Sequence, residues 1–219
     1  MHSALKTYRF APAGAAPATA RPGHLFVFLH GTGATAQSMI PLAFRFQSRF
    51  PSAALVVPSG FRAAEADAGL QQWFPMQGLN DDNRVERVNA ILPRLEDLVR
   101  REQAQNGVPP RRTVLIGYSQ GGTALASSSA VVAYAARFAR LPREGASIAS
   151  RIHLVHGADD MIVSRVHAER AARVLSALHV PVTLDIVERL GHRLSHEAAC
   201  LGSLRLLQGI YEGRRATLH

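Results

Sequence analysis

The sequence predicts an α/β protein in which a mostly parallel central sheet is flanked by helices. Three observations lead to this expectation. Short apolar runs bounded by turn residues alternate with segments whose apolar residues recur at helical spacing, which is typical of strands joined through helices. The length of 219 residues and the 47% hydrophobic content suit one domain with a substantial core. No internal repeat or break in composition marks a second domain.

Six apolar runs are expected to form the strands. The first, HLFVFLH at residues 24–30, is almost continuously apolar and ends at Gly31, as expected for a buried strand. The second, at residues 54–57, ends at the turn sequence Pro-Ser-Gly. The other expected strands are residues 113–116, 131–135, 152–155 and 182–187. Because helical segments separate most of these runs, parallel pairing is expected.

Four segments predict helices. Residues 83–105 carry apolar side chains at helical spacing, with Asp81 or Asp82 as the expected N-cap and a kink expected at Pro93. Small, helix-compatible residues fill positions 121–130. The two remaining expected helices are residues 165–178 and the closing segment 196–211.

We expect residues 1–22 to form an irregular segment and residues 23–219 to form one folded domain. Residues 10–21 are rich in alanine and proline and lack the apolar stretch of a secretory signal. No run reaches the roughly 18 apolar residues of a membrane-spanning helix. Cys200 is the only cysteine, which excludes an intramolecular disulfide and fits a reducing compartment. A cytoplasmic protein without a membrane span is therefore expected.

The formal net charge of +9 raises the hypothesis of a nucleic-acid or anionic-surface partner. The distribution of the 25 basic residues argues against it, because most are scattered arginines without interleaved aromatic residues. We expect a solvated arginine-rich surface and no nucleic-acid partner. The sequence is compatible with a homo-oligomer.

Residues 117–121 read Gly-Tyr-Ser-Gln-Gly and stand between an expected strand and an expected helix. In that setting G-x-S-x-G is typical of a sharp turn that holds the serine in a strained backbone conformation. The flanking glycines leave room that a Cβ atom would fill. The N-terminus of the helix directs partial positive charge toward an oxyanion beside the serine. Ser119 is therefore the candidate nucleophile, and an inert serine in a glycine-rich turn is the alternative.

A serine hydroxyl needs a neighbouring base, and the base needs a third group that fixes its tautomer. Asp160 follows the expected strand at residues 152–155, and His192 follows the expected strand at residues 182–187. The carboxyl ends of parallel strands meet at one edge of a sheet, where clefts form. His192 is therefore the candidate general base, and Asp160 is the candidate orienting acid.

Five motifs together resemble the carboxylesterase/phospholipase branch of the α/β-hydrolases, which includes acyl-protein-thioesterase-like enzymes. The motifs are HGTG at residues 30–33, QWF at 72–74, GYSQGG at 117–122, HGADDMIV at 156–163 and GH at 191–192. The resemblance covers nearly the whole chain from residue 24 onward, and the chain order Ser, Asp, His agrees with it. The family pattern HG-x-x-D-x-x-V implies that the acid is Asp160 rather than Asp159. Ala34 stands where the acyl-protein thioesterases have an acidic residue, so their protein substrate is not carried over.

The resemblance also implies which groups surround the reacting ester. The backbone N–H groups of Thr32 and Gln120 are the expected oxyanion donors. Trp73, Phe74 and Met76 lie in an otherwise polar, glycine-containing segment, and either they line the acyl pocket or they belong to the core.

The expected function is that of a serine hydrolase that cleaves small-molecule carboxylic esters through an acyl-enzyme. A thioesterase or lysophospholipase with the same triad is the alternative, and the three triad residues disfavour a noncatalytic binding protein. His30 and His156 are expected to be structural or pocket-lining, because the chain order already assigns the base. No cofactor is expected. Ten histidines without a second carboxylate cluster at ligand spacing give no reason to expect a metal.

Overall fold

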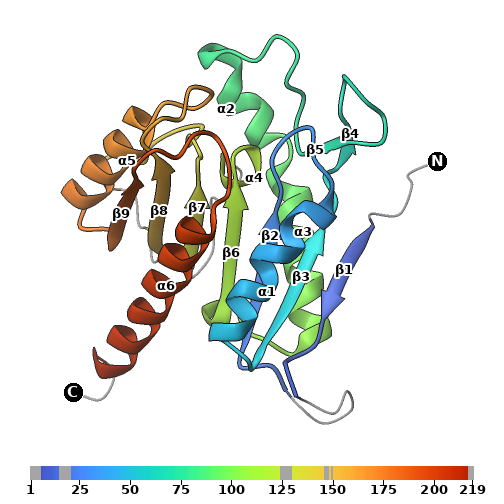
Figure 1. Cartoon of the computed structure of the whole chain (residues 1–219), viewed down its shortest axis with the longest axis vertical. Coiled ribbons are helices and arrows are strands. Elements are labelled where there is room, and N and C mark those ends of the chain that lie inside the picture. Colours follow the sequence, from blue (N-terminus) through green and yellow to red (C-terminus); the bar gives the residue numbers. More distant parts are fainter. Residues whose placement is uncertain (1–5, 15–20, 124–129, 146–147, 149, 217–219) are drawn as a thin grey trace.

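The computed structural model describes residues 6–14, 21–123, 130–145, 148 and 150–216. Their centre is a seven-stranded sheet in the order β1-β3-β2-β6-β7-β8-β9 (Figure 1). The strands are β1 (Thr7–Phe10), β2 (His24–Leu29), β3 (Ala53–Pro58), β6 (Thr113–Tyr118), β7 (Ala130–Tyr134), β8 (Arg151–Gly157) and β9 (Val182–Val187). Strand β1 pairs antiparallel with β3, and the other neighbours pair in parallel. The expected α/β fold with a mostly parallel sheet is thereby confirmed.

Helices cover both faces of the sheet. They are α1 (Ile40–Arg49), α2 (Asp81–Asn89), α3 (Leu92–Asn106), α4 (Gln120–Thr123), α5 (Val166–Ala177) and α6 (His196–Ala216), with the 3₁₀ turns η1 (Ala36–Met39) and η2 (Pro110–Arg112). Alternation along β2 divides the core, because successive strand side chains point to opposite faces. Leu25 and Val27 pack with residues of α3 and α5, whereas Phe26 and Phe28 pack with residues of α1 and α6. Helices α1 and α6 lie in front of the sheet in Figure 1.

The segment expected as one kinked helix over residues 83–105 is two helices, α2 and α3. The side chain of Asn80 caps α2 by accepting hydrogen bonds from the backbone N–H groups of Asp82 and Asn83, so the expected aspartate N-cap was wrong. Pro93 lies in the first turn of α3 rather than inside a helix. Proline is tolerated there because the first N–H groups of a helix have no intrahelical acceptor.

The expectation of an irregular segment over residues 1–22 was wrong for β1. Thr7 of β1 lies opposite Pro58 and Phe10 lies opposite Leu55. A four-residue edge strand without an apolar run gives little periodic signal. The helix expected over residues 121–130 is described only as α4, and Ala130 already belongs to β7. Residues 124–129 lie outside the described part of the chain.

Helix α1 and the short strands β4 (Arg62–Ala63) and β5 (Gln71–Gln72) had no counterpart among the expected elements. Helix α1 connects β2 to β3, and β4 and β5 form an antiparallel pair. A bridge between Ala34 and Gln71 joins the end of this pair to the turn after β2. This arrangement brings the segment after β5 to the carboxyl edge of the sheet, which lies at the top of Figure 1. Among the described residues, no helix is long and apolar enough to cross a bilayer.

Candidate active site

Ser119 stands at the turn between β6 and α4 and has a positive φ of 51°. The turn is held in place by its backbone N–H group, which donates to the carbonyl of Tyr134 at 2.9 Å. A Cβ atom on Gly117 would lie 2.5 Å from the backbone nitrogen of Gly122, and one on Gly121 would overlap the carbonyl oxygen of Leu29. Both glycines are therefore required by close backbone approach, and the strained turn expected around the serine is present.

Three side chains from three strand ends form a continuous hydrogen-bonded chain. The Nε2 atom of His192 lies 2.9 Å from Oγ of Ser119, and its Nδ1 atom lies 2.8 Å from Oδ2 of Asp160. Because the carboxylate can only accept, Nδ1 carries the proton and Nε2 is left as an acceptor for the serine hydroxyl. This is the protonation state that a general base requires.

Asp160 is buried and is held in place by the backbone of the turn that follows it. Its Oδ1 atom accepts from the N–H groups of Ile162 at 3.0 Å and Val163 at 2.8 Å. Burial alone would raise the pKa of Asp160. The hydrogen bonds from His192 and the two backbone amides outweigh burial and keep the pKa below its ordinary value. Asp159 is exposed, so the two neighbouring carboxylates occupy different environments.

The two histidines expected as structural or pocket-lining are both buried and bonded to backbone. His30 accepts from the N–H of Gly60 at 2.9 Å through Nε2, and its Nδ1 donates to the carbonyl of Gly31 at 2.7 Å. His156 donates from Nε2 to the carbonyl of Val163 at 2.7 Å. Burial lowers the pKa of both histidines, which keeps them neutral.

Tyr118 is a contact of the site that sequence reasoning missed. Its hydroxyl donates to the backbone carbonyl of His192 at 2.9 Å, and its ring lies 5.3 Å from the imidazole, centroid to centroid. The residue before Ser119 therefore fixes the backbone of His192, which is 74 residues away in the chain. Tyr118 occupies the first x position of the G-x-S-x-G motif. Because any residue type fits that position of the motif, the sequence offers no reason to single out Tyr118.

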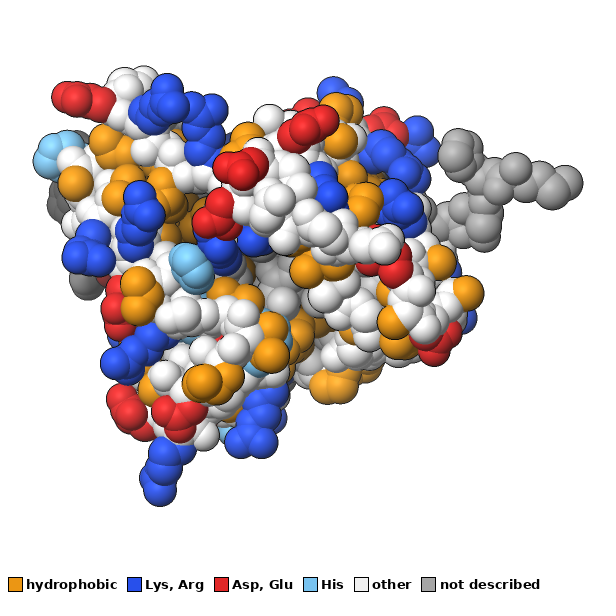
Figure 2. All heavy atoms as spheres, turned by 90° about the horizontal axis from the view of Figure 1, so that it is seen from above, with side chains coloured by type: hydrophobic (Ala, Val, Ile, Leu, Met, Phe, Trp, Pro, Cys, Tyr) orange, Lys and Arg blue, Asp and Glu red, His pale blue; other side chains and the backbone are white. Residues whose placement is uncertain are grey.

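A cavity of about 410 Å³ opens beside Ser119 and His192. Thr32 and Gln120, whose backbone N–H groups are the expected oxyanion donors, both lie on its wall, as do Phe74 and Met76. Figure 2 looks onto this edge of the molecule and shows basic side chains and a histidine beside a central hollow.

Trp73 does not line this cavity, so of the two alternatives that the sequence left open, core or pocket, it takes the core. It is fully buried, and its Nε1 donates to the carbonyl of His30 at 2.8 Å. The side chain of Gln120 holds the backbone of Trp73 and Phe74. Its Oε1 accepts from the N–H of Trp73 and its Nε2 donates to the carbonyl of Phe74, each at 2.8 Å. Both side chains are buried, and of the two only Phe74 also lines the cavity.

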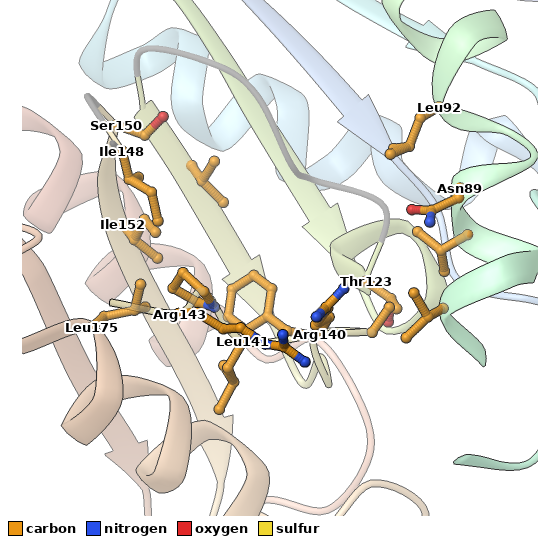
Figure 3. A pocket seen from close by; sticks show the side chains of 16 residues that line it. Asn89, Leu92, Thr123, Arg140, Leu141, Arg143, Ile148, Ser150, Ile152 and Leu175 are labelled. Carbon is orange, nitrogen blue, oxygen red and sulfur yellow. The ribbon is translucent and has the colours of Figure 1, made fainter. Parts of the chain in front are cut away.

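A second cavity, of about 370 Å³, is shown in Figure 3. Thr123 lines both cavities. Asn89 and Leu92 border the second cavity on one side, and Ile152 and Leu175 border it on the other. It contains none of the three side chains of the hydrogen-bonded chain. Among the described residues, no group of three or more His, Cys, Asp or Glu side chains could hold a metal ion.

A model of the phospholipase/carboxylesterase family matches residues 15–199. The esterase YpfH of Escherichia coli (strain K12) is 39% identical over 182 residues, covering 80% of this chain and 78% of the relative.

Among solved structures, esterase PE8 superposes with a TM-score of 0.82 at 24% identity, covering 93% of this chain and 98% of that one. Acyl-protein thioesterase 2 of Zea mays superposes with a TM-score of 0.69 at 18% identity, covering 93% and 98%. At such identities the structures support the fold alone.

Proposed function

Because the chain belongs to the phospholipase/carboxylesterase family of α/β-hydrolases and is thus an esterase-type hydrolase, we propose that it cleaves small-molecule carboxylic esters with Ser119 as nucleophile. The single observation that carries the proposal is the hydrogen-bonded chain from Asp160 through His192 to Ser119. It supplies a nucleophile, a base with a free acceptor nitrogen, and a carboxylate that fixes the tautomer.

In the proposed acylation step, Oγ of Ser119 attacks the ester carbonyl carbon while Nε2 of His192 takes the hydroxyl proton. The backbone N–H groups of Thr32 and Gln120 stabilise the negative charge on the carbonyl oxygen. When the tetrahedral intermediate collapses, the bond to the alkoxide breaks and His192 returns the proton to the leaving alcohol. The serine is then acylated.

Deacylation repeats the same proton transfers with water as the nucleophile. His192 removes a proton from water, the oxygen attacks the acyl carbon, and the carboxylic acid leaves as Ser119 regains its proton. Asp160 stays ionised throughout and stabilises the imidazolium, which fits a carboxylate whose pKa is held below its ordinary value. No cofactor takes part in these steps.

A thioester or a lysophospholipid could be cleaved by the same three residues. We favour a carboxylic ester because the relative with 39% identity is an esterase. The assignment of one domain to residues 23–219, a cytoplasmic location and the compatibility with a homo-oligomer also remain predictions. Gel filtration would test the oligomeric state, and cell fractionation would test the location.

Replacing Ser119 with alanine tests the proposal. We expect turnover of 4-nitrophenyl butyrate to fall by on the order of 10⁶, because a triad nucleophile typically carries a factor of that size. Circular dichroism should show an unchanged fold, since the turn tolerates a smaller side chain. Ser48→Ala is the matched control, because Ser48 is an exposed residue of α1. A folded Ser119→Ala protein that keeps even a tenth of the wild-type turnover would contradict the assignment.

A further inference from the structure

The cavity beside Ser119 has one cationic wall. Arg84 of α2, Arg137 in the loop after β7 and His167 of α5 all line it together with the nucleophile. These residues come from three separate elements, so their convergence depends on the fold and has no counterpart in a local sequence pattern. None of them takes part in the triad or in the expected oxyanion site.

The positive charge on this wall exceeds the negative charge that faces it. Asp81 is the carboxylate with which both arginines pair. Its Oδ1 atom lies 2.7 Å from Nη2 of Arg137 but 3.7 Å from Nη2 of Arg84, which is beyond hydrogen-bonding distance. In the described part of the chain, one carboxylate thus pairs with two guanidinium groups, and the side chain of this carboxylate is 71% exposed to solvent.

Arg84 differs from the arginines that have a complete partner. Arg205, for example, donates from two nitrogens to both carboxylate oxygens of Asp185, at 2.9 and 2.7 Å. The side chain of Arg84 is only 17% exposed, and its buried Nε atom has no hydrogen-bond partner among the described residues. A buried, incompletely paired guanidinium is costly unless an anion completes it.

The electrostatic surroundings agree with an excess of positive charge. Burial lowers the pKa of Arg84, and the neighbouring charge of Arg137 lowers it further. Burial also lowers the pKa of His167, and Arg137 again adds to the effect. The contribution of Arg137 to both shifts shows that a further positive charge is disfavoured at this wall, whereas burial disfavours an unpaired charge of either sign.

The apolar part of the cavity suits the carbon skeleton of an organic anion. Phe74, Met76 and Leu79 line it with apolar side chains, and Ser119 lies on the same cavity. A ligand that fills it would therefore touch apolar surface along its chain and cationic surface at one end. Guanidinium groups bind planar oxyanions through paired N–H donors, which favours a carboxylate or a phosphate.

We propose that the ester cleaved at Ser119 carries a negatively charged oxyanion group, a carboxylate or a phosphate, which Arg84 and Arg137 bind while the ester bond lies at the serine. This inference rests on the proposed function and names its substrate class. It makes the two arginines specificity-determining residues and assigns them no part in the proton transfers.

Matched pairs of esters test the proposal. Monoethyl adipate and ethyl hexanoate differ only in a terminal carboxylate on the acyl side. The acetate esters of 6-hydroxyhexanoate and of hexanol place the same difference on the alcohol side, and 6-phosphohexyl acetate replaces the carboxylate by a phosphate. Acid release measured near neutral pH gives kcat/KM for each ester. Comparing these values shows whether the cationic wall prefers a carboxylate or a phosphate, and whether that group belongs to the acyl or the alcohol part of the ester.

For wild type we expect at least one charged ester to be preferred over its neutral partner by about tenfold or more, as charge-assisted hydrogen bonds allow. Arg84→Gln and Arg137→Gln should each reduce that ratio by roughly fivefold or more. The preference should also weaken in about 1 M NaCl, where exposed charges are screened. Arg101→Gln is the matched control, because Arg101 is a 78% exposed residue of α3 outside the cavity. Its ratio should equal that of wild type.

Two results would overturn the proposal while leaving the proposed function intact. The first is hydrolysis of the neutral esters with no preference for any charged partner, and the second is a preference that survives both cavity variants. Failure of the folded protein to cleave any ester, charged or neutral, would instead overturn the proposed function and with it this inference. Circular dichroism of each variant shows that the fold is kept.

Discussion

His192 and His153 belong to the same half of the sheet, yet their surroundings give them opposite roles. His192 follows β9 at the carboxyl edge, where both ring nitrogens have polar partners, Ser119 and Asp160. His153 lies inside β8 and is only 4% exposed. Its Nδ1 lies 2.9 Å from the hydroxyl of its cross-strand neighbour Thr183, and its buried Nε2 has no partner among the described residues.

The difference shows that position relative to the strand end decides what a histidine can do. Beyond a strand end, the chain leaves the ladder and side chains from different strands converge. Within a strand, the neighbours are fixed by pairing and pleat. Burial lowers the pKa of His153 to about 4, and the positive charges of Arg151 and Arg205 act in the same direction. His153 is thus a neutral core residue, whereas His192 lies between Ser119 and Asp160, where the proposed general base is needed.

Removing the carboxylate that orients His192 should have the largest effect on this comparison. We expect Asp160→Asn to lower kcat by about 10⁴, because the amide can donate to the imidazole and favour the wrong tautomer. Asp159→Asn should be nearly normal, because that side chain is exposed. Steady-state hydrolysis of a 4-nitrophenyl ester by both purified variants gives the comparison. The reverse ranking of two folded proteins would show that the acid is assigned to the wrong neighbour.

The interior histidine should affect stability rather than rate. Between its ordinary pKa of about 6.5 and its folded pKa of about 4, His153 binds a proton in the unfolded chain but not in the native one. The free energy of unfolding should therefore fall as pH falls through this window, by up to about 3 kcal/mol in total. Urea unfolding of wild type and His153→Asn from neutral to acidic pH measures the difference in slope.

His30, His156 and Asp160 also have lowered pKa values, so they weaken the fold in acid as well, and only the difference between variant and wild type isolates His153. His179→Asn, which changes an exposed histidine, is the control. Equal slopes for wild type and His153→Asn would show that burial does not keep His153 neutral.

The smallest expected effect concerns the hydrogen bond that holds the backbone of His192 at the carboxyl edge of the sheet. His153 is fixed by the β-ladder, whereas the carbonyl of His192 accepts from the hydroxyl of Tyr118. Tyr118→Phe removes this one hydrogen bond, typically worth about 0.5–1.5 kcal/mol, so kcat should fall roughly threefold to tenfold. Tyr211→Phe, at an exposed position of α6, should leave kcat unchanged. Equal kcat values for both variants would show that Tyr118 does not position the base.

The sequence predicted those parts of the protein whose signals are local. The buried strands, the strained turn at Ser119 and the positions of Asp160 and His192 after strand ends depend on short patterns, and the described fold contains all of them. Helix α1 has apolar residues at helical spacing, Leu42, Ala43 and Phe46, but no side chain caps its start. The helical spacing of these apolar residues would have predicted α1 even without a capping residue.

Other features could not be predicted because they depend on contacts distant in sequence. The backbone N–H of Trp73 donates to the side chain of Gln120, which is 47 residues away. The pairing of Arg137 with Asp81 spans 56 residues. Neither pattern is visible before the fold is known. For the same reason, sequence reasoning identified the candidate triad but not the cationic wall of its cavity.

The central claim is that His192 activates Ser119, and covalent labelling tests it most directly. A fluorophosphonate probe reacts with a serine only when its hydroxyl is activated, and peptide mass spectrometry locates the adduct. We predict a single adduct on Ser119 in wild type and labelling at least about a hundredfold slower in folded His192→Ala, because the general base is lost. An adduct on another residue, or labelling of His192→Ala at the wild-type rate, would contradict the account.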